Sequence, residues 1–299
     1  MTLVDEARPT APARSPTSFP GAVEFDLSSK ISGRTYRILV YQPPVPAPEA
    51  GHPVVFLSDG NMNFPIAAAM GAMFAFSNCP VLIVGVGYPT TNPLDLMFMR
   101  TRDLTPPTPI AAIPSQPGLP PPTPENYGGD AEFLSFLVDE LRPAIAAEWP
   151  SDPNRQVLYG YSLGGLFSLS ALFARPAAFS VFVGASPSIW WNGRALLAGE
   201  AEFARRMEAG EAAPRVLITI GGEEQSLPKT PPPGYTQEQI GELLKTSRMV
   251  DNARELAGRL AAIKGPSGYE ARFHRFDGDD HLTAMAGSVA RALDFALRG

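Results

Sequence analysis

The chain has few of the residues from which disulfides and metal sites are built, and it lacks the long apolar run that a membrane span requires. One cysteine, Cys79, and three histidines occur among its 299 residues. A lone cysteine excludes an internal disulfide, and no Cys/His spacing suits zinc. There is no run of about eighteen apolar residues, the minimum for a transmembrane helix. We therefore expect no metal site and no membrane partner, and we expect Cys79 to be a buried core thiol.

Basic clusters and nucleotide-binding loops are missing as well. The formal net charge is −6, and Lys and Arg are spread thinly, which excludes nucleic acid as a partner. Residues 85–90 begin like a dinucleotide loop but lack the third glycine, and Pro89 interrupts them. We expect no organic cofactor. The start of the chain has no apolar signal-like segment, which predicts a cytoplasmic protein. The oligomeric state stays open.

Proline is abundant instead, with 33 residues. Residues 1–20 are rich in Pro, Ser, Ala and Arg and are expected to form a disordered tail. Residues 21–299 are expected to form one domain. Within it, prolines crowd residues 88–128, where we expect an irregular insert and no regular structure. Residues 105–126 of this insert could form a lid or entrance wall.

Short apolar runs alternate with longer helical patterns along the domain, which predicts a mostly parallel sheet with helices on both faces. Strands are expected at residues 22–26, 34–41, 53–58, 81–87, 156–161, 179–184, 215–220 and 269–276. Helices are expected at residues 64–76, 130–149 (where Pro143 could introduce a kink), 163–173, 194–207, 236–263 and 283–297. This order of elements is that of an α/β-hydrolase fold.

The most informative motif is Gly-Tyr-Ser-Leu-Gly at residues 160–164, between a predicted strand and a predicted helix. A serine at positive φ on such a tight turn requires neighbours without colliding side chains, and Gly160 and Gly164 meet that need. The pattern predicts a nucleophile elbow at Ser162. The backbone N–H of Leu163 would then face the developing oxyanion.

One of the three histidines should serve as the general base. His281 follows the last strand and precedes the last helix, the position at which this fold places its histidine. We expect His52 at the surface and His274 on a strand face. No metal is needed for this chemistry.

The acid should follow the strand at 215–220, where Glu223 and Glu224 are available, and the spacing favours Glu224. Asp277, Asp279 and Asp280 are rivals close to His281, but aspartates also shape and cap turns, which we favour for them. A second oxyanion donor is expected from the loop after the third strand, as the backbone N–H of Asn61. An ordinary Asp-Gly turn explains that loop equally well.

Five segments carry a resemblance to a known family. They are residues 55–60 (VFLSDG), 100–106 (RTRDLTP), 160–167 (GYSLGGLF), 185–191 (ASPSIWW) and 278–281 (GDDH). Over residues 21–298 the chain resembles the putative esterase family of α/β-hydrolases, most closely its siderophore trilactone esterase branch. The resemblance implies Ser162 as nucleophile, His281 as base, Glu224 as acid, and Asn61 and Leu163 as oxyanion donors. The chain departs from the family in having Glu where Asp is common, and in its longer Pro-rich insert.

The substrate is less sharply indicated. Trp190 and Trp191 could stack on an acyl group or form a buried wall. Arg100 and Arg102 could hold an anionic substrate or pair with Asp103. We predict a serine carboxylic-ester hydrolase acting on a small-molecule ester, either a siderophore lactone or another acyl ester. The alternatives are an acyltransferase with the same residues and a non-catalytic binding protein on this scaffold.

Overall fold

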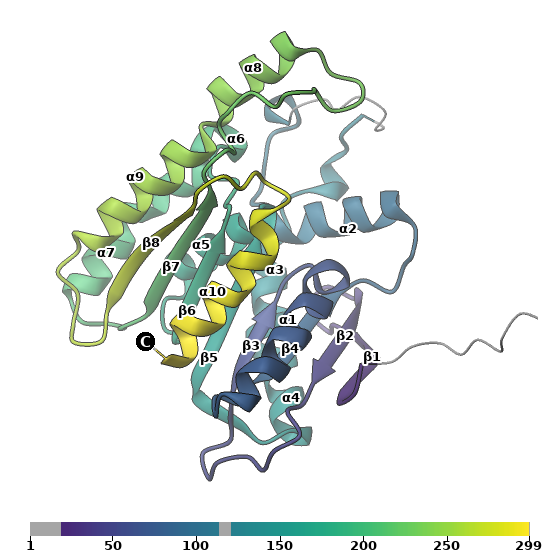
Figure 1. The fold of residues 1–299 in the computed structure, drawn as a ribbon, viewed down its shortest axis with the longest axis vertical. Coiled ribbons are helices and arrows are strands. Elements are labelled where there is room, and N and C mark those ends of the chain that lie inside the picture. The colour runs from purple at the N-terminus through teal and green to yellow at the C-terminus, as the bar shows by residue number, and fades with distance from the viewer. Residues whose placement is uncertain (1–18, 114–120, 299) are drawn as a thin grey trace, which may run out of the picture.

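A computed structural model describes residues 19–113 and 121–298 of the chain. An eight-stranded sheet forms its centre (Figure 1). The strands are β1 (Ala22–Ser28), β2 (Thr35–Tyr41), β3 (His52–Leu57), β4 (Leu82–Gly87), β5 (Ser151–Tyr161), β6 (Val181–Ala185), β7 (Arg215–Gly221) and β8 (Glu270–Phe276). Most of the predicted tail, residues 1–18, and residues 114–120 of the predicted insert lie outside the described residues.

The spatial order of the strands is β1-β2-β4-β3-β5-β6-β7-β8. The pairs β1–β2 and β2–β4 are antiparallel, and every later pair, from β4–β3 to β7–β8, is parallel. The inner strands β3, β4 and β6 are buried along their whole length, as expected for strands covered on both faces. The predicted α/β-hydrolase fold is confirmed. Its carboxyl edge, the upper edge in Figure 1, is where parallel strands of such a sheet present functional groups.

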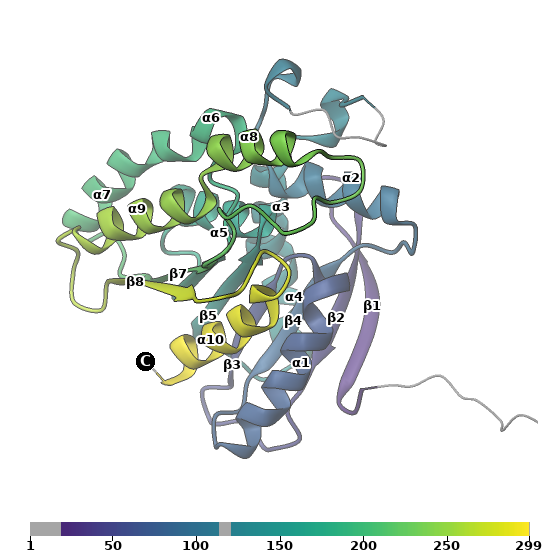
Figure 2. The ribbon, with the colours of Figure 1, turned by 45° about the horizontal axis from the view of Figure 1, so that its top comes forward.

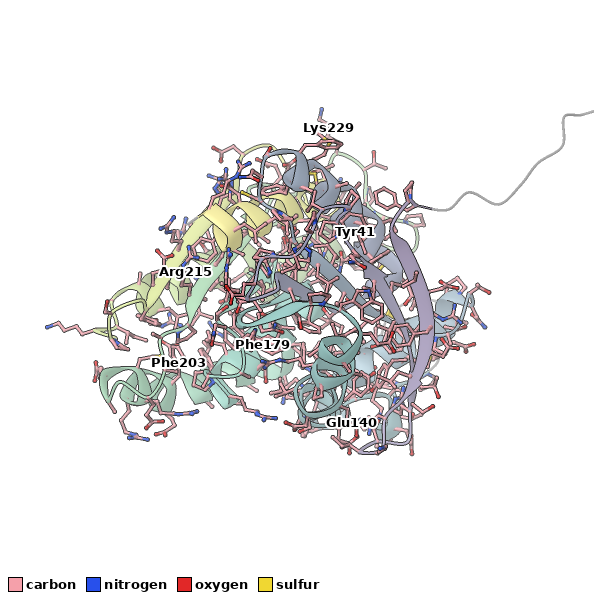
Figure 3. All side chains as sticks on the ribbon, turned by 90° about the horizontal axis from the view of Figure 1, so that it is seen from below. Tyr41, Glu140, Phe179, Phe203, Arg215 and Lys229 are labelled. Atoms are coloured by element: carbon pink, nitrogen blue, oxygen red, sulfur yellow. The ribbon has the colours of Figure 1, made fainter. Side chains whose placement is uncertain are left out.

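Helices cover both faces of the sheet. They are α1 (Gly60–Phe76), α2 (Pro93–Leu104), α3 (Asp130–Ser135), α4 (Arg142–Glu148), α5 (Leu163–Ala174), α6 (Trp191–Arg194), α7 (Glu200–Glu208), α8 (Gln237–Ser247), α9 (Met249–Ala261) and α10 (Ala284–Arg298). Apolar side chains of α1 and α10 pack on one face, and those of α3, α4, α5, α7 and α9 pack on the other. Phe179 and Phe203, labelled in Figure 3, are buried on this second face.

The helix α8 lies over the carboxyl edge of the sheet, which Figure 2 brings toward the viewer. One continuous helix was expected over 236–263, but α8 and α9 are separate because Arg248 adopts the left-handed conformation with φ 44°. A capping box formed by Thr236 and Gln239 fixes the start of α8. None of the described helices combines the length and apolar composition that crossing a bilayer requires.

The prediction that the insert holds no regular structure was wrong for its first part. Residues 93–104 form α2, with Pro93 in the first turn and the Asn92 side chain accepting a hydrogen bond from the Leu94 N–H. Proline is well tolerated at that position because its missing N–H would have no helical partner. The crowded prolines begin at Pro106, after α2 has ended. The later part contains the short 3₁₀ turns 110–112 and 124–126.

The helix expected over 130–149 forms as α3, a π-helical segment at 136–141 and α4. The π-helical segment ends at Leu141, two residues before Pro143, which lacks an N–H and cannot continue the regular helical hydrogen bonds. The proline therefore changes the hydrogen-bond register and does not end the helix.

Two expectations for single residues also need correction. His52 is buried and not at the surface, since it opens β3 between two neighbouring strands, and burial lowers its pKa. Cys79 is only partly buried, because it lies in the turn between α1 and β4 and not in the strand. His274 lies on β8 opposite Thr219, as expected for a strand-face histidine.

Candidate active site

Ser162 occupies a strained turn between the end of β5 and the start of α5. Its backbone has φ 60° and ψ −114°, a conformation that is rare for a residue other than glycine. Its N–H donates to the Ala185 carbonyl at 2.9 Å, and its own carbonyl accepts from the Ser188 N–H at 3.1 Å. These bonds to the end of β6 and to the segment after it hold the strained turn in place. The predicted elbow geometry is therefore present at Ser162.

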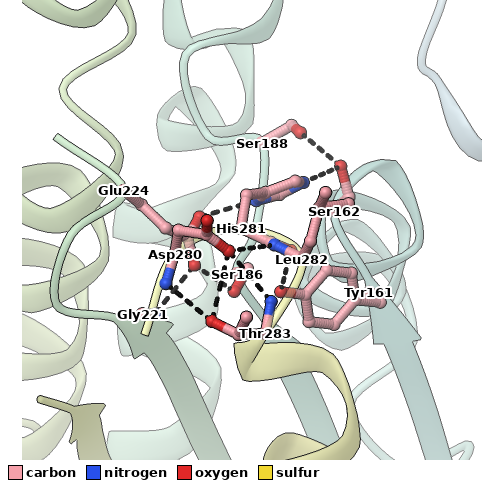
Figure 4. Close-up of polar contacts among 10 residues, drawn as sticks. All are labelled: Tyr161, Ser162, Ser186, Ser188, Gly221, Glu224, Asp280, His281, Leu282 and Thr283. Carbon is pink, nitrogen blue, oxygen red and sulfur yellow. Dashed lines mark hydrogen bonds and ion pairs between the residues drawn. The ribbon is translucent and has the colours of Figure 1, made fainter. Parts of the chain in front are cut away.

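Three side chains distant in sequence form one chain of hydrogen bonds (Figure 4). The Ser162 Oγ lies 3.1 Å from His281 Nε2, and His281 Nδ1 lies 2.7 Å from Glu224 Oε2. Since an ionised carboxylate can only accept, a neutral His281 donates from Nδ1 and accepts the serine proton at Nε2. Such an arrangement can remove the hydroxyl proton while a fixed negative charge stabilises the resulting imidazolium.

Backbone hydrogen bonds between two turns bring Glu224 and His281 together. The Gly222 N–H donates to the Phe276 carbonyl at 2.8 Å, and the Glu223 N–H donates to the Asp279 carbonyl at 2.9 Å. The turn after β7 is thereby joined to the turn after β8. At Gly221 a side chain is excluded, because a Cβ there would lie 2.6 Å from the Asp279 carbonyl oxygen. The spacing that favoured Glu224 over Glu223 thus corresponds to the carboxylate that contacts His281.

Two neighbours orient His281 itself. The Tyr161 hydroxyl donates to the His281 carbonyl at 2.7 Å. Asp280 Oδ1 accepts from the N–H groups of Thr283 and Leu282, and these bonds lower the pKa of Asp280. Asp280 therefore shapes the turn before α10, the structural function that the sequence favoured for it.

The second oxygen of Glu224 is held as firmly as the first. Oε1 accepts from the Gly221 N–H at 2.7 Å and from the Ser186 hydroxyl at 2.5 Å. The Glu224 side chain is only 1% exposed, so water does not compete for these bonds. The carboxylate is consequently fixed from both sides, with only Oε2 facing His281.

The two expected oxyanion donors flank the elbow on different elements. Leu163 is the first residue of α5, where an N–H has no carbonyl of a preceding turn to bind. Asn61 lies in the first turn of α1, and its side chain is used to bind the backbone of Tyr88 at 3.0 and 2.7 Å. The loop before it touches the elbow, since a Cβ on Gly164 would lie 2.3 Å from Ser58 Oγ.

The two arginines proposed for substrate binding are engaged in ion pairs. Arg100 binds Asp59 with two parallel hydrogen bonds of 2.8 Å; the Asp59 side chain is buried, and that of Arg100 is 11% exposed. Arg102 pairs with Glu132 at 2.8 Å. Asp103, which the sequence suggested as a partner of both arginines, instead lies 3.6 Å from Arg34. Burial raises the pKa of Asp103 to about 6. Arg100 thus ties α2 to the residue that precedes Gly60 and Asn61.

A cavity of about 430 Å³ opens beside Ser162. It is lined by Ser162, Ser188, Trp190, Glu224, Leu243, Leu244, Thr246, Ser247, Met249 and His281. Trp190 therefore faces the space available to a substrate. Trp191 is buried, donates its indole N–H to Thr108 Oγ1 at 2.9 Å and stacks on Tyr127, so it packs against the insert.

Several residues of the site were not assigned a function from the sequence. Ser186 contacts Glu224, Ser188 Oγ lies 3.4 Å from Ser162 Oγ, and Leu243, Leu244 and Met249 line the cavity. A signal for the two serines was available, because they follow β6, the strand between the strand that precedes Ser162 and the strand that precedes Glu224. No local pattern indicated that the helices α8 and α9 would cover the cavity.

An α/β-hydrolase fold with a serine elbow beside a histidine and a carboxylate defines the class as the serine hydrolases. The profile of the family described as "Putative esterase" matches residues 119–281. The ferri-bacillibactin esterase BesA of Bacillus subtilis is 34% identical, with 94% of this chain and 91% of that protein covered. The chain belongs to this family of esterases, and the family resemblance of its sequence is confirmed.

Further relatives agree with this membership. A siderophore triacetylfusarinine C esterase of Aspergillus fumigatus is 33% identical, with 81% of this chain and 80% of that protein covered. Among solved structures, the siderophore hydrolase EstB from Aspergillus nidulans has a TM-score of 0.79 at 28% identity, with 95% of this chain and 98% of that chain covered. The enzyme is therefore a serine esterase.

Replacing Gly160 by alanine should damage the elbow. A Cβ at Gly160 would lie 1.9 Å from the Gly164 carbonyl oxygen, a backbone atom that cannot turn aside. We expect Gly160→Ala to lose about 1–3 kcal/mol of unfolding free energy. Displacement of Ser162 should lower kcat about 100-fold. Gly258→Ala, in open space on α9, is the matched control and should be fully active. Chemical denaturation and ester turnover measure both, and a fully active Gly160→Ala would contradict this geometry.

The two arginine pairs should differ in their contribution to stability. Arg100→Met leaves the buried Asp59 carboxylate without its partner, which should cost about 3–5 kcal/mol of unfolding free energy. Arg102→Met removes a more exposed pair and should cost less than about 1 kcal/mol. Urea denaturation of the two variants tests the difference. If Arg100→Met were as stable as the wild type and weakened only substrate binding, Arg100 would be a substrate ligand.

Proposed function

We propose that Ser162, His281 and Glu224 are the nucleophile, general base and acid of this esterase. Ser162 Oγ attacks the ester carbonyl while its proton passes to His281 Nε2. Glu224 stabilises the imidazolium through Nδ1. The backbone N–H groups of Leu163 and Asn61 donate to the oxyanion.

The tetrahedral intermediate then collapses. The carbon–oxygen bond to the alcohol breaks, the alcohol takes the proton from His281, and the acyl group stays on Ser162. A water molecule, deprotonated by His281, attacks the acyl-enzyme and releases the carboxylic acid. The serine recovers its proton, so that the enzyme is unchanged after each cycle.

The single observation that carries the proposal is the continuous chain from Ser162 to Glu224. Its members are separated by 119 and 57 residues in sequence but by hydrogen-bond distances in space. Ser162 and His281 also line the same cavity. Chance proximity of three such groups at the carboxyl edge of this sheet is a poor explanation, because this edge is where the fold places its reacting groups.

We further propose that the substrate is a siderophore ester. Its support is the similarity to BesA and to the triacetylfusarinine C esterase, which act on siderophores by name. The cavity offers Trp190 and the apolar side chains of Leu243, Leu244 and Met249 to the part of the substrate that enters it. Iron carried by such a substrate is cargo and takes no part in the reaction described. We retain the sequence-based proposals of a cytoplasmic location and of no nucleic acid or membrane partner.

Chromogenic short-chain esters test the catalytic proposal. We expect turnover by the wild type and a loss of at least about 1,000-fold in kcat for Ser162→Ala, because the acyl group has no other acceptor. His281→Ala and Glu224→Gln should lose activity as well. The matched controls are His274→Ala and Glu223→Gln, which change the same residue types outside the hydrogen-bonded chain and should stay near the wild-type rate.

The products identify the reaction and the substrate. Hydrolysis of a panel of iron-bound and iron-free siderophore lactones should release free acid, which mass spectrometry detects. Formation of a new ester when an alcohol acceptor is added would instead indicate an acyltransferase. If simple esters are cleaved but no siderophore is, the esterase assignment stands and the siderophore proposal fails.

A further inference from the structure

The Glu224 carboxylate accepts a hydrogen bond from the hydroxyl of Ser186, the residue that directly follows β6. Ser186 Oγ donates to Glu224 Oε1 at 2.5 Å, and both side chains are buried. Figure 4 shows Ser186 on the side of the carboxylate away from the His281 ring. The only other donor to Oε1 found among the described residues is the Gly221 N–H.

Backbone hydrogen bonds fix the position of the Ser186 hydroxyl. Ser186 directly follows β6, which lies between the nucleophile's strand β5 and the acid's strand β7. Its N–H donates to the Thr219 carbonyl of β7 at 2.8 Å, and the preceding carbonyl, of Ala185, accepts from the Ser162 N–H. Ser186 adopts φ 42°, a left-handed conformation in which glycine would be the residue of least strain. Because a serine occupies this strained position, we infer that its side chain has a function there.

We propose that Ser186 is a positioning residue for the acid of the esterase, acting through Glu224 on His281. This inference rests on the proposed roles of those two residues. A glutamate has one more rotatable bond than an aspartate, so its carboxylate needs an additional anchor to hold one orientation. The Ser186 hydroxyl supplies this anchor and keeps Oε2 directed at His281 Nδ1. A charge-assisted bond of this length is also a strong one.

The same bond affects the charge that His281 experiences. Without the hydroxyl, the carboxylate is less stabilised and takes up a proton at higher pH. While it is ionised, the Glu224 carboxylate also holds the imidazolium proton more strongly, because its negative charge is shared with fewer hydrogen-bond donors. The first effect removes, at low pH, the negative charge that stabilises the imidazolium during catalysis, and the second reduces the fraction of neutral base. Both move the acid limb of the pH–rate profile to higher pH.

Other charged or titratable groups surround the pair. Tyr161 on β5 approaches Ser186 and Glu224, while Asp279 and Asp280 lie in the turn before α10. Arg275 on β8 donates to the Gly222 carbonyl at 3.3 Å. Of these groups Tyr161 interacts with the Ser186 hydroxyl, but burial raises the pKa of Tyr161 above its ordinary value, so it carries no charge at the pH of the acid limb. A shift of the acid limb in a Ser186 variant therefore reports the lost hydroxyl.

Two variants separate the hydroxyl from the backbone conformation. Ser186→Ala removes the hydroxyl and keeps the strain, whereas Ser186→Gly removes the hydroxyl and relieves it. With a chromogenic ester, we expect both to lower kcat about tenfold. We expect KM to change little, and the acid limb of kcat/KM to move to higher pH in both. Each rate is taken per folded protein, as determined by circular dichroism and denaturation.

Ser288→Ala is the matched control. Ser288 is also fully buried and its hydroxyl also bonds a partner, Tyr159, at 2.7 Å, but it lies on α10 away from the pair. This variant should lose stability without moving the pH profile. The proposal is overturned if both Ser186 variants keep the wild-type profile, or if Ser186→Gly alone recovers full activity. Ser162→Ala distinguishes the failures, because undiminished turnover by that variant would refute the proposed function itself.

Discussion

The hydrogen bond between His281 and Glu224 is the interaction on which the site depends. It joins the turn after β7 to the turn after β8, and its geometry is possible only because backbone bonds already hold those turns together. Gly221 allows the close approach, since any side chain there would collide with the neighbouring turn. Ser162 completes the chain from the far side of β6. The catalytic proposal therefore rests on the alignment of four parallel strand ends, from β5 to β8.

Backbone strain is concentrated at this same edge. Asp59, Ser162 and Ser186 each have positive φ without being glycine, and each lies just beyond the end of a strand. Each is held by bonds to other elements: Asp59 by Arg100, Ser162 by the end of β6 and the segment after it, and Ser186 by β7 and Glu224. Such conformations persist only where the surroundings fix them. The strained residues are the proposed nucleophile, one anchor of the proposed acid, and a residue of the loop before Asn61.

Much of this arrangement was predictable from the sequence, because its signals are local. Ser162 stands in a motif that requires a strand before it and a helix after it, and the positions of His281 and Glu224 follow from the order of elements. The ion pairs of Arg100 and Arg102 were not predictable, since their partners are 41 and 30 residues away. The helix α2 could not be predicted from the proline content of residues 88–128 as a whole, because the crowded prolines lie after the end of the helix at Leu104. The burial of His52 depends on the neighbours of β3 in space.

The central claim is that this set of side chains activates one particular hydroxyl. Mass spectrometry after brief exposure to an organophosphonate that modifies activated serines tests it most directly. The account predicts a single adduct in the folded wild type, located on the peptide that contains Ser162, and no adduct within the same time in His281→Ala. An adduct on another residue, or equal labelling of the two proteins, would contradict it.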